Sequence, residues 1–339
     1  MPTPVLVLCY RANQIDHSIS PPFDEERPLM RAVTLTEVPG TPAIAELDIP
    51  TPDANELLVR VRASSVNGFD VGTVTGQLKE MMEHRFPLVP GRDFAGTVEA
   101  VGVDVEGFAI GDEVFGMVAK DHLGTGSYAQ YATVPATVGV AHRPAGLPVQ
   151  EAGALGLAGA AAVASLDALG ELSGRTLLVS GATGGVGAFV LQLAAGRGAR
   201  VIATARPGTE ADFVRSLNGG VHVVDYSVDF ADQVLSIAPI GVDAVLHLAG
   251  DLAMLTSLAR DGGTVASTLT APETPEGRRL TTTMIMTTPT RGLLSDLAGL
   301  AASGALTIPI AAIYDLDETS EAFARFTAGT LGKISLSID

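Results

Sequence analysis

The pattern of hydrophobic and polar positions changes near residue 150. In residues 32–140, short segments alternate apolar and polar side chains between Gly and Pro residues, as residues 56–62 (ELLVRVR) illustrate. This period of two predicts a β-rich lobe. Beyond residue 150, helical stretches rich in Ala, Gly and Leu separate short apolar segments at residues 176–180, 200–204, 222–225, 244–248 and 264–268. Strands and helices that alternate at this spacing predict a parallel, doubly wound α/β sheet.

The remaining predicted elements lie at the two ends of the chain. Residues 280–287 (LTTTMIMT) predict a further strand, residues 293–303 a helix, and residues 332–338 a final strand. Residues 1–29 precede the first predicted strand and form an N-terminal arm, or they result from an upstream translation start. The length of 339 residues favours two domains, because a single core stops growing near about 250–300 residues.

The net charge limits the partners that the protein can bind. A charge of −17 gives a surface that repels phosphate backbones and anionic lipids, so we expect neither nucleic acid nor a membrane as a partner. Cys9 is the only cysteine, which excludes an intrachain disulfide and a zinc site built from several thiolates. A single thiol is typical of a reducing compartment, and we therefore expect a cytoplasmic protein.

A glycine-rich turn follows the strand predicted at residues 176–180. The stretch ATGGVG at residues 182–187 contains the last two glycines of a dinucleotide-binding fingerprint, with Ala182 in place of the first. Such glycines let the backbone approach a pyrophosphate, and the amide end of the next helix faces the anion. A tight turn without a ligand is the alternative. The strands before and after the turn favour the dinucleotide site.

The end of the next predicted strand indicates which nucleotide is bound. An NAD site usually places Asp or Glu there to accept from the ribose 2′-hydroxyl, whereas an NADP site has a cation or a neutral group. The sequence TARPG at residues 204–208 has no acid before Glu210. The planar guanidinium of Arg206 is able to form two hydrogen bonds to a 2′-phosphate. An exposed arginine without a ligand is the alternative. We therefore predict NADP(H) as the cofactor.

Further motifs extend along the chain from Met30 to the C-terminus, at residues 65–70 (SVNGFD), 86–98 (FPLVPGRDFAGTV), 111–116, 126–131, 182–187, 242–250, 261–263 and 332–334 (GKI). Together with the β-rich lobe and the order of the elements, they resemble the medium-chain dehydrogenase/reductase superfamily. Within it, they are similar to the zinc-independent quinone oxidoreductase and enoyl reductase branch.

The resemblance implies a fold, a cofactor site and a division into domains. A Rossmann dinucleotide-binding domain, residues 151–294, would be inserted into a GroES-like β-barrel catalytic domain, residues 30–150 and 295–339. NADP(H) would lie in the cleft, in contact with Thr183, Gly184, Gly185, Val186 and Gly187 at the pyrophosphate, Arg206 and Tyr226 at the 2′-phosphate, Leu248 at the ribose, and Thr268 and Leu269 at the nicotinamide. Packing against the next helix is an alternative role for Tyr226.

Zinc-dependent relatives differ from this chain at their metal ligands. The resemblance places their catalytic Cys at Val66-Asn67 and their His-Glu pair at Arg92 and Asp93, and their four-cysteine structural loop has no counterpart. Zinc in such a site needs thiolate or imidazole ligands around an open coordination position. With Arg92 at the His position and no cysteine in either lobe, we expect no metal.

The candidates for catalysis are Asn67, Tyr128 and Thr73, with Thr75 as a further hydroxyl candidate. The Asn67 amide is able to donate to an acceptor oxygen, or Asn67 forms a turn after a strand. Tyr128 is a candidate proton donor, with a core aromatic as the alternative. Thr73 and Thr75 offer hydroxyl groups where several relatives carry a tyrosine. Asp70 is expected to cap the helix that follows it.

These features predict an NADPH-dependent oxidoreductase that transfers hydride, without a metal, to a quinone or a small α,β-unsaturated carbonyl compound. Such conjugated acceptors place negative charge on a distant oxygen, where hydrogen bonds suffice to stabilise it. Two alternatives remain open: an enoyl-thioester reductase of a biosynthetic pathway, and a catalytically inert NADPH-binding sensor or scaffold. The strand at residues 280–287 lies where relatives pair edge to edge, so we also expect a homodimer.

Overall fold

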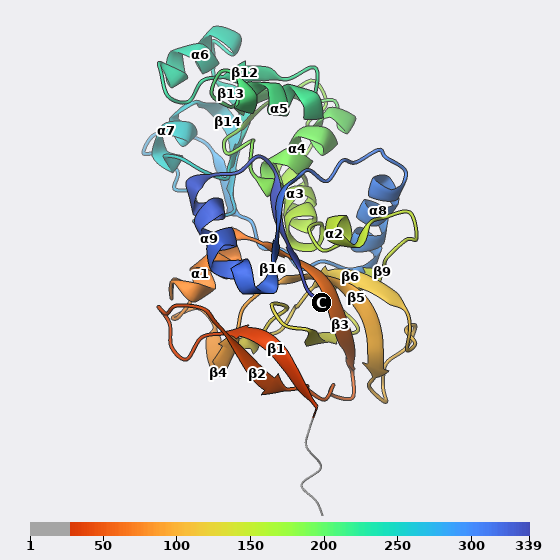
Figure 1. Ribbon diagram of the computed structural model, residues 1–339. Coiled ribbons are helices and arrows are strands. Elements are labelled where there is room, and N and C mark those ends of the chain that lie inside the picture. The colour runs from red at the N-terminus through yellow and green to blue at the C-terminus, as the bar shows by residue number, and fades with distance from the viewer. Residues whose placement is uncertain (1–27) are drawn as a thin grey trace, which may run out of the picture.

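The computed structural model describes residues 28–339, which form two lobes with C-terminal segments between them (Figure 1). The arm predicted for residues 1–29 lies outside the described residues except for its last two. The first strand, β1 (Leu29–Thr34), pairs with β2 (Ala43–Asp48). The first described strand therefore begins one residue before the predicted start at Met30.

The upper lobe in Figure 1 contains a six-stranded sheet in the order β12-β11-β10-β13-β14-β15. Every pair of neighbouring strands in it is parallel. The strands are β10 (Thr176–Val179), β11 (Arg200–Thr204), β12 (His222–Val224), β13 (Val242–His247), β14 (Ala259–Ser267) and β15 (Thr281–Met284). The order reverses between β10 and β13, as in a Rossmann fold. The predicted doubly wound sheet is confirmed.

Side chains along β10 show why both faces of this sheet are covered. Leu177 and Val179 belong to a core shared with α3 (Gly156–Leu169), α4 (Gly185–Gly196) and α5 (Thr209–Leu217). Leu178, between them, belongs to a core shared with α6 (Phe230–Ile237) and α7 (Leu252–Ser257). Successive strand residues point to opposite faces, so an uninterrupted apolar strand needs helices on both sides.

The lower lobe is the GroES-like domain, built around a sheet in the order β16-β17-β3-β5-β6-β9, with β8 paired to β3. Its strands are β3 (Glu56–Val66), β5 (Asp93–Val101), β6 (Glu113–Met117), β8 (Tyr131–Pro135), β9 (Val140–His142), β16 (Ile310–Asp315) and β17 (Lys333–Ser337). Beside this sheet lie β4 (Glu83–Val89) and β7 (His122–Thr125), which pair with each other, and the helices α1 (Gly68–Val74), α2 (Val149–Ala152), α8 (Arg291–Ala302) and α9 (Thr319–Ala328). The last two strands of the chain join the first lobe, as the resemblance implied.

The predicted domain boundary at residues 294 and 295 falls inside α8. Leu294 and Leu297 of this helix belong to one hydrophobic core that also contains Phe115 of the lower lobe and Leu177 of the upper lobe. Because the core is continuous between the lobes, the apolar pattern shows no break where the chain returns to the first lobe.

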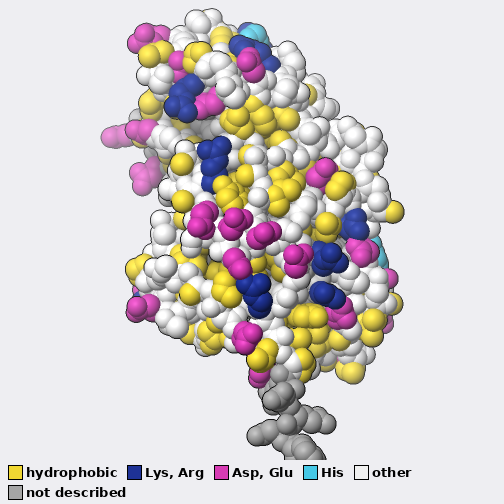
Figure 2. Space-filling view, in the orientation of Figure 1, with side chains coloured by type: hydrophobic (Ala, Val, Ile, Leu, Met, Phe, Trp, Pro, Cys, Tyr) yellow, Lys and Arg dark blue, Asp and Glu magenta, His cyan; other side chains and the backbone are white. Residues whose placement is uncertain are grey.

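The outer surface carries the predicted dimerisation strand and much of the negative charge. β15 is the edge strand of the Rossmann sheet, and Met286 just beyond it is 74% exposed. Acidic side chains gather over α9 and the segment before it, which contains Asp317 and Glu318 (Figure 2). Among residues 28–339, no helix combines the length and the apolar character needed to cross a membrane.

Candidate functional site

The glycine-rich turn lies between the carboxyl end of β10 and the start of α4. Gly181 has a positive φ of 67° and donates its backbone N–H to Thr204 Oγ1 at 3.1 Å. Gly184, in extended conformation, precedes the first helical residue, Gly185. The first amides of a helix have no intrahelical acceptor, and they favour an anion at this end.

Close packing in this turn leaves no space for side chains at two positions. A Cβ atom on Gly187 would lie 2.4 Å from the carbonyl oxygen of Gly181. A Cβ atom on Gly185 would lie 2.5 Å from Cδ of Lys333. Both glycines are therefore required by contacts that hold the turn in place. The turn exposes backbone amides to a ligand, which fits the predicted pyrophosphate site at Thr183, Gly184, Gly185, Val186 and Gly187.

The strand after the turn brings together the residues predicted at the 2′-phosphate. The Arg206 guanidinium donates to Glu210 Oε1 from Nε at 2.8 Å and from Nη2 at 2.5 Å. It also lies 5.8 Å from the centre of the Tyr226 ring, and the Tyr226 hydroxyl donates to the same Glu210 oxygen at 3.4 Å. The structure thus adds Glu210, in the first turn of α5, to the predicted pair.

The remaining cofactor candidates follow neighbouring strands of the same sheet. Leu248 comes directly after β13, and its backbone N–H donates to Ser180 Oγ at 3.2 Å. Thr268 and Leu269 come directly after β14, and Leu269 is 57% exposed. Because all these strands are parallel, their carboxyl ends meet at one edge of the sheet, where the turn also lies.

A buried polar network joins the two lobes beside the glycine turn. Gly332 donates its N–H to the carbonyl oxygen of Thr183 at 2.8 Å, which places Lys333 at the start of β17 against the turn. Lys333 Nζ donates to Asn67 Oδ1 at 2.5 Å and lies 3.4 Å from Asp93 Oδ2. The Lys333 and Asp93 side chains are 3% and 0% exposed. Sequence reasoning noted the GKI motif but assigned Lys333 no role.

Asn67 forms the centre of this network at the start of α1. Its amide nitrogen donates to Asp93 Oδ2 at 2.9 Å, and its oxygen accepts from Lys333. Its backbone N–H donates to Asp70 Oδ2 at 2.9 Å, so the expected capping role of Asp70 is confirmed. Both the nitrogen and the oxygen of the Asn67 side-chain amide thus have hydrogen-bond partners within the protein. Its donation to an acceptor oxygen stays a prediction.

The other two catalytic candidates have different surroundings. Tyr128 is 0% exposed, and its hydroxyl donates to the Ser65 carbonyl at 3.1 Å and to Asp70 Oδ2 at 3.2 Å. Burial, and then the nearby Asp70, raise the pKa of Tyr128 well above its usual range. The structure therefore places Tyr128 in the core, in agreement with the alternative interpretation, and its role as a proton donor stays a prediction that these contacts do not favour. Thr73 donates to the Phe69 carbonyl at 2.9 Å and lines a pocket.

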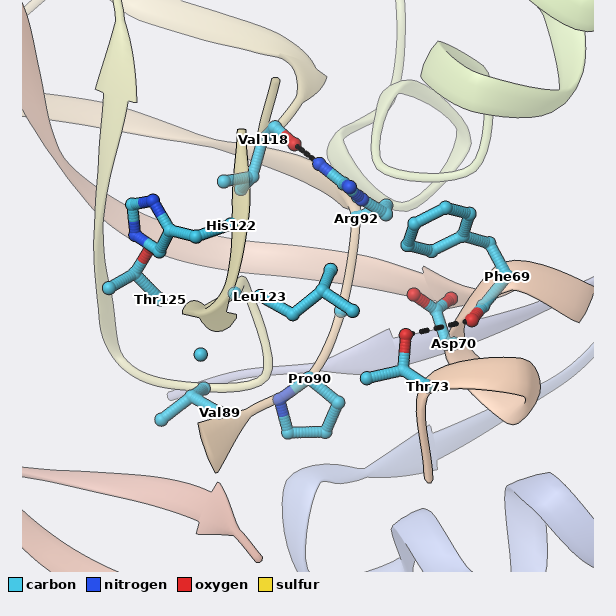
Figure 3. A pocket seen from close by; sticks show the side chains of 13 residues that line it. Phe69, Asp70, Thr73, Val89, Pro90, Arg92, Val118, His122, Leu123 and Thr125 are labelled. Atoms are coloured by element: carbon cyan, nitrogen blue, oxygen red, sulfur yellow. Dashed lines mark hydrogen bonds between the residues drawn. The ribbon is translucent and has the colours of Figure 1, made fainter. Parts of the chain in front are cut away.

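This pocket lies in the GroES-like lobe between α1, the segment before β5 and β7 (Figure 3). The Arg92 guanidinium lies over the Phe69 ring, 4.3 Å from its centre, and Nη1 donates to the Val118 carbonyl. Asp70 lines the same pocket. Burial, and secondarily Asp93, raise the pKa of Asp70 to about 7, against hydrogen bonds from Asn67 that lower it.

The positions that correspond to zinc ligands in metal-dependent relatives carry Asn67 and Arg92, and the Arg92 side chain offers no lone pair to a metal. Among the residues that the structure describes, no three His, Cys, Asp or Glu side chains are grouped closely enough to hold a metal ion.

Comparisons with known proteins agree with this arrangement. Residues 53–145 match the family model of the alcohol dehydrogenase GroES-like domain, and residues 218–335 match the model described as zinc-binding dehydrogenase. The chain is 31% identical over 328 residues to the chloroplastic quinone-oxidoreductase QR1 of Triphysaria versicolor, an alignment covering 90% of this chain and 98% of that protein.

Two further comparisons define more narrowly the family to which the chain belongs. It is 33% identical over 246 residues to 2-methylene-furan-3-one reductase of Solanum lycopersicum, which covers 70% of this chain and 61% of that protein. The quinone oxidoreductase structure from Coxiella burnetii superimposes with a TM-score of 0.80 at 26% identity, covering 92% of this chain and 100% of that one. The protein is therefore an oxidoreductase that belongs to the quinone oxidoreductase branch of the medium-chain dehydrogenase/reductase superfamily.

Proposed function

We propose that the protein is an NADPH-dependent reductase that transfers hydride to a quinone or a small α,β-unsaturated carbonyl compound. The observation that carries the proposal is the glycine turn, which places the first amides of α4 at the carboxyl end of β10, where they favour an anion. Two relatives, a quinone-oxidoreductase and a 2-methylene-furan-3-one reductase, support acceptors of this class. Bound NADPH would supply the hydride, and the turn would hold its pyrophosphate.

The arginine after β11 supports NADPH over NADH. Arg206 is paired with Glu210, but the Arg206 side chain is 61% exposed. Exposed ion pairs contribute only about 0–1 kcal/mol. A 2′-phosphate, which carries more charge and forms stronger charge-assisted hydrogen bonds, would therefore replace the carboxylate as the partner of Arg206 at little cost.

The acceptor class is tested by steady-state kinetics with a panel of quinones and enones, measured as the loss of NADPH absorbance. We expect turnover with at least one of these classes and slower turnover with saturated ketones. Tight NADPH binding without reduction of any acceptor would contradict the proposal and would favour an inert nucleotide-binding protein.

Replacing Arg206 with alanine is expected to raise the Kd for NADPH about 10- to 100-fold, because a hydrogen bond to a charged group contributes about 1.5–3 kcal/mol. The Kd for NADH should change little, since NADH lacks the 2′-phosphate. Calorimetry with both nucleotides measures the difference. Arg215→Ala, an exposed position on the helix α5 that follows Arg206, is the matched control. Equal losses of affinity for NADH and NADPH would show that Arg206 does not contact the 2′-phosphate.

We also propose that two copies of the chain assemble through the free edge of β15. An unpaired edge strand is a template for another strand, and the exposed Met286 extends this edge. Light scattering at micromolar concentration is expected to give twice the mass of one chain, and a monomer would refute the assembly.

We place the protein in the cytoplasm, because one cysteine in 339 residues fits a reducing compartment.

A further inference from the structure

The pocket beside α1 contains a buried cation, Arg92, that forms no ion pair among the described residues and is stabilised only at longer range by Asp70 of the same pocket. Arg92 is 7% exposed, and its hydrogen bonds go to the Val118 carbonyl and, at 3.6 Å, to Met82 Sδ. No ion pair of Arg92 occurs anywhere in residues 28–339. A guanidinium has five N–H donors, so several remain for a ligand. A buried charge is costly unless it is paired.

A carboxyl group with an unused oxygen lies in the same pocket. Asp70 is 1% exposed, and Oδ2 accepts from the Asn67 backbone and from Tyr128, whereas Oδ1 has no hydrogen-bond partner. A buried polar atom without a partner is uncommon in folded proteins and requires an explanation. In Figure 3, the Arg92 and Asp70 side chains both lie next to Phe69.

We propose that this pocket binds the carboxylate group of a small, conjugated acid, with Arg92 as its cationic partner. The inference rests on the proposed function, because this acid would be the hydride acceptor, and it narrows the acceptor class. A carboxylate matches the planar fork of a guanidinium. In a protein of net charge −17, an anion needs such a local positive site.

Two observations favour a singly charged, small ligand over a phosphate-bearing one. Among the described residues that line the pocket, Arg92 is the one Lys or Arg side chain. The nearby Lys333 is already bonded to Asn67 and Asp93. A dianionic phosphate beside Asp70 and Asp93 would therefore remain undercompensated. The pocket is small and opens to solvent at its mouth, so a ligand would place only its carboxylate end beside Arg92.

Binding is expected to depend on pH through Asp70. Asp93, Tyr128 and Lys333 surround this carboxyl group, and Arg92 and His122 line the pocket with it. A bound carboxylate disfavours ionised Asp70, whereas protonated Asp70 is able to donate from Oδ1. Because the pKa of Asp70 is raised to about 7, affinity should be greatest below neutral pH and fall above it. The variant His122→Gln, which keeps Asp70, should retain this dependence.

The test is calorimetric titration of the full chain with trans-but-2-enoate and with its neutral amide. We expect the acid to bind at least about 10-fold more tightly than the amide, and Arg92→Met to remove this difference, since a charged hydrogen bond contributes about 1.5–3 kcal/mol. Arg92→Lys should restore part of it. Arg62→Met, an exposed arginine on β3 that does not line the pocket, is the matched control. NADPH affinity unchanged from the wild type shows that each variant is folded.

The outcomes separate this inference from the proposed function. Carboxylate binding that survives Arg92→Met, or equal affinity for the acid and its amide, would overturn the inference even if enones are reduced. If the protein binds the acid through Arg92 but reduces no acceptor, the inferred carboxylate site is supported and the proposed reductase function is contradicted.

Discussion

Replacing Lys333 with methionine is expected to lower the free energy of unfolding by about 3–5 kcal/mol, the usual result of removing one partner of a buried ion pair. Lys333 and Asp93 are almost completely buried, and Lys333 also donates to the Asn67 amide. Methionine fills a similar volume but leaves the Asp93 carboxylate without a cation. Urea denaturation of the full chain measures the loss.

A double-mutant cycle identifies the ion pair as the cause. Asp93→Asn removes the uncompensated charge, so the double variant should lose less stability than the two single variants combined, by about 0.5–3 kcal/mol. Recovery will be incomplete, because Asp93 also accepts from Ser65 Oγ and from the backbone of Leu157, each at 2.6 Å. Lys79→Met, an exposed substitution, should change stability by no more than about 0.5 kcal/mol. Strictly additive losses would exclude coupling between Lys333 and Asp93.

The network around Lys333 also shows what the sequence alone was unable to predict. Lys333 is 266 residues from Asn67 and 240 from Asp93. The three side chains meet because β17 pairs with the end of β3, where Ile334 lies opposite Val66. Strand pairing between distant segments has no local signature, so the GKI motif was noticed without its partners.

Local patterns predicted the Rossmann lobe much better. Strand β11 agrees with its predicted range of residues 200–204, and the glycine turn lies between a strand and a helix as expected. These features depend on the period of the apolar positions and on glycine spacing within a few residues. Glu210 was noted only as a later acid, but the turn into α5 brings its carboxylate back onto Arg206.

Tyr128 illustrates the limit for single aromatic residues. Its sequence neighbours, Gly126, Ser127 and Ala129, favour a core residue but also allow a site residue. The structure decides, because the Tyr128 ring packs in the core with Phe94 and Ile334 from two other strands. Its hydroxyl donates to the Ser65 carbonyl oxygen and to Asp70 Oδ2.

Replacing Gly187 with alanine is expected to disrupt both the turn and nucleotide binding. The added Cβ would lie 2.4 Å from the Gly181 carbonyl oxygen and 2.7 Å from the Ala182 Cα atom. These are backbone atoms that move only if α4 separates from the end of β10. Overpacking of this kind costs about 1–3 kcal/mol. Displacing the amide end of α4 should also weaken NADPH binding by more than about 10-fold, since each 1.4 kcal/mol is a factor of ten.

The same helix supplies the control. Gly196 ends α4, is exposed, and has nothing within 4 Å of an added Cβ. Gly196→Ala should therefore raise stability by up to about 1 kcal/mol, because alanine has the higher helix propensity, and should leave the Kd for NADPH unchanged. Thermal unfolding and calorimetry on both variants compare one substitution in two surroundings. If Gly187→Ala bound NADPH as tightly as Gly196→Ala, the nucleotide would not depend on close packing at this turn, and the proposed pyrophosphate site would have to lie elsewhere.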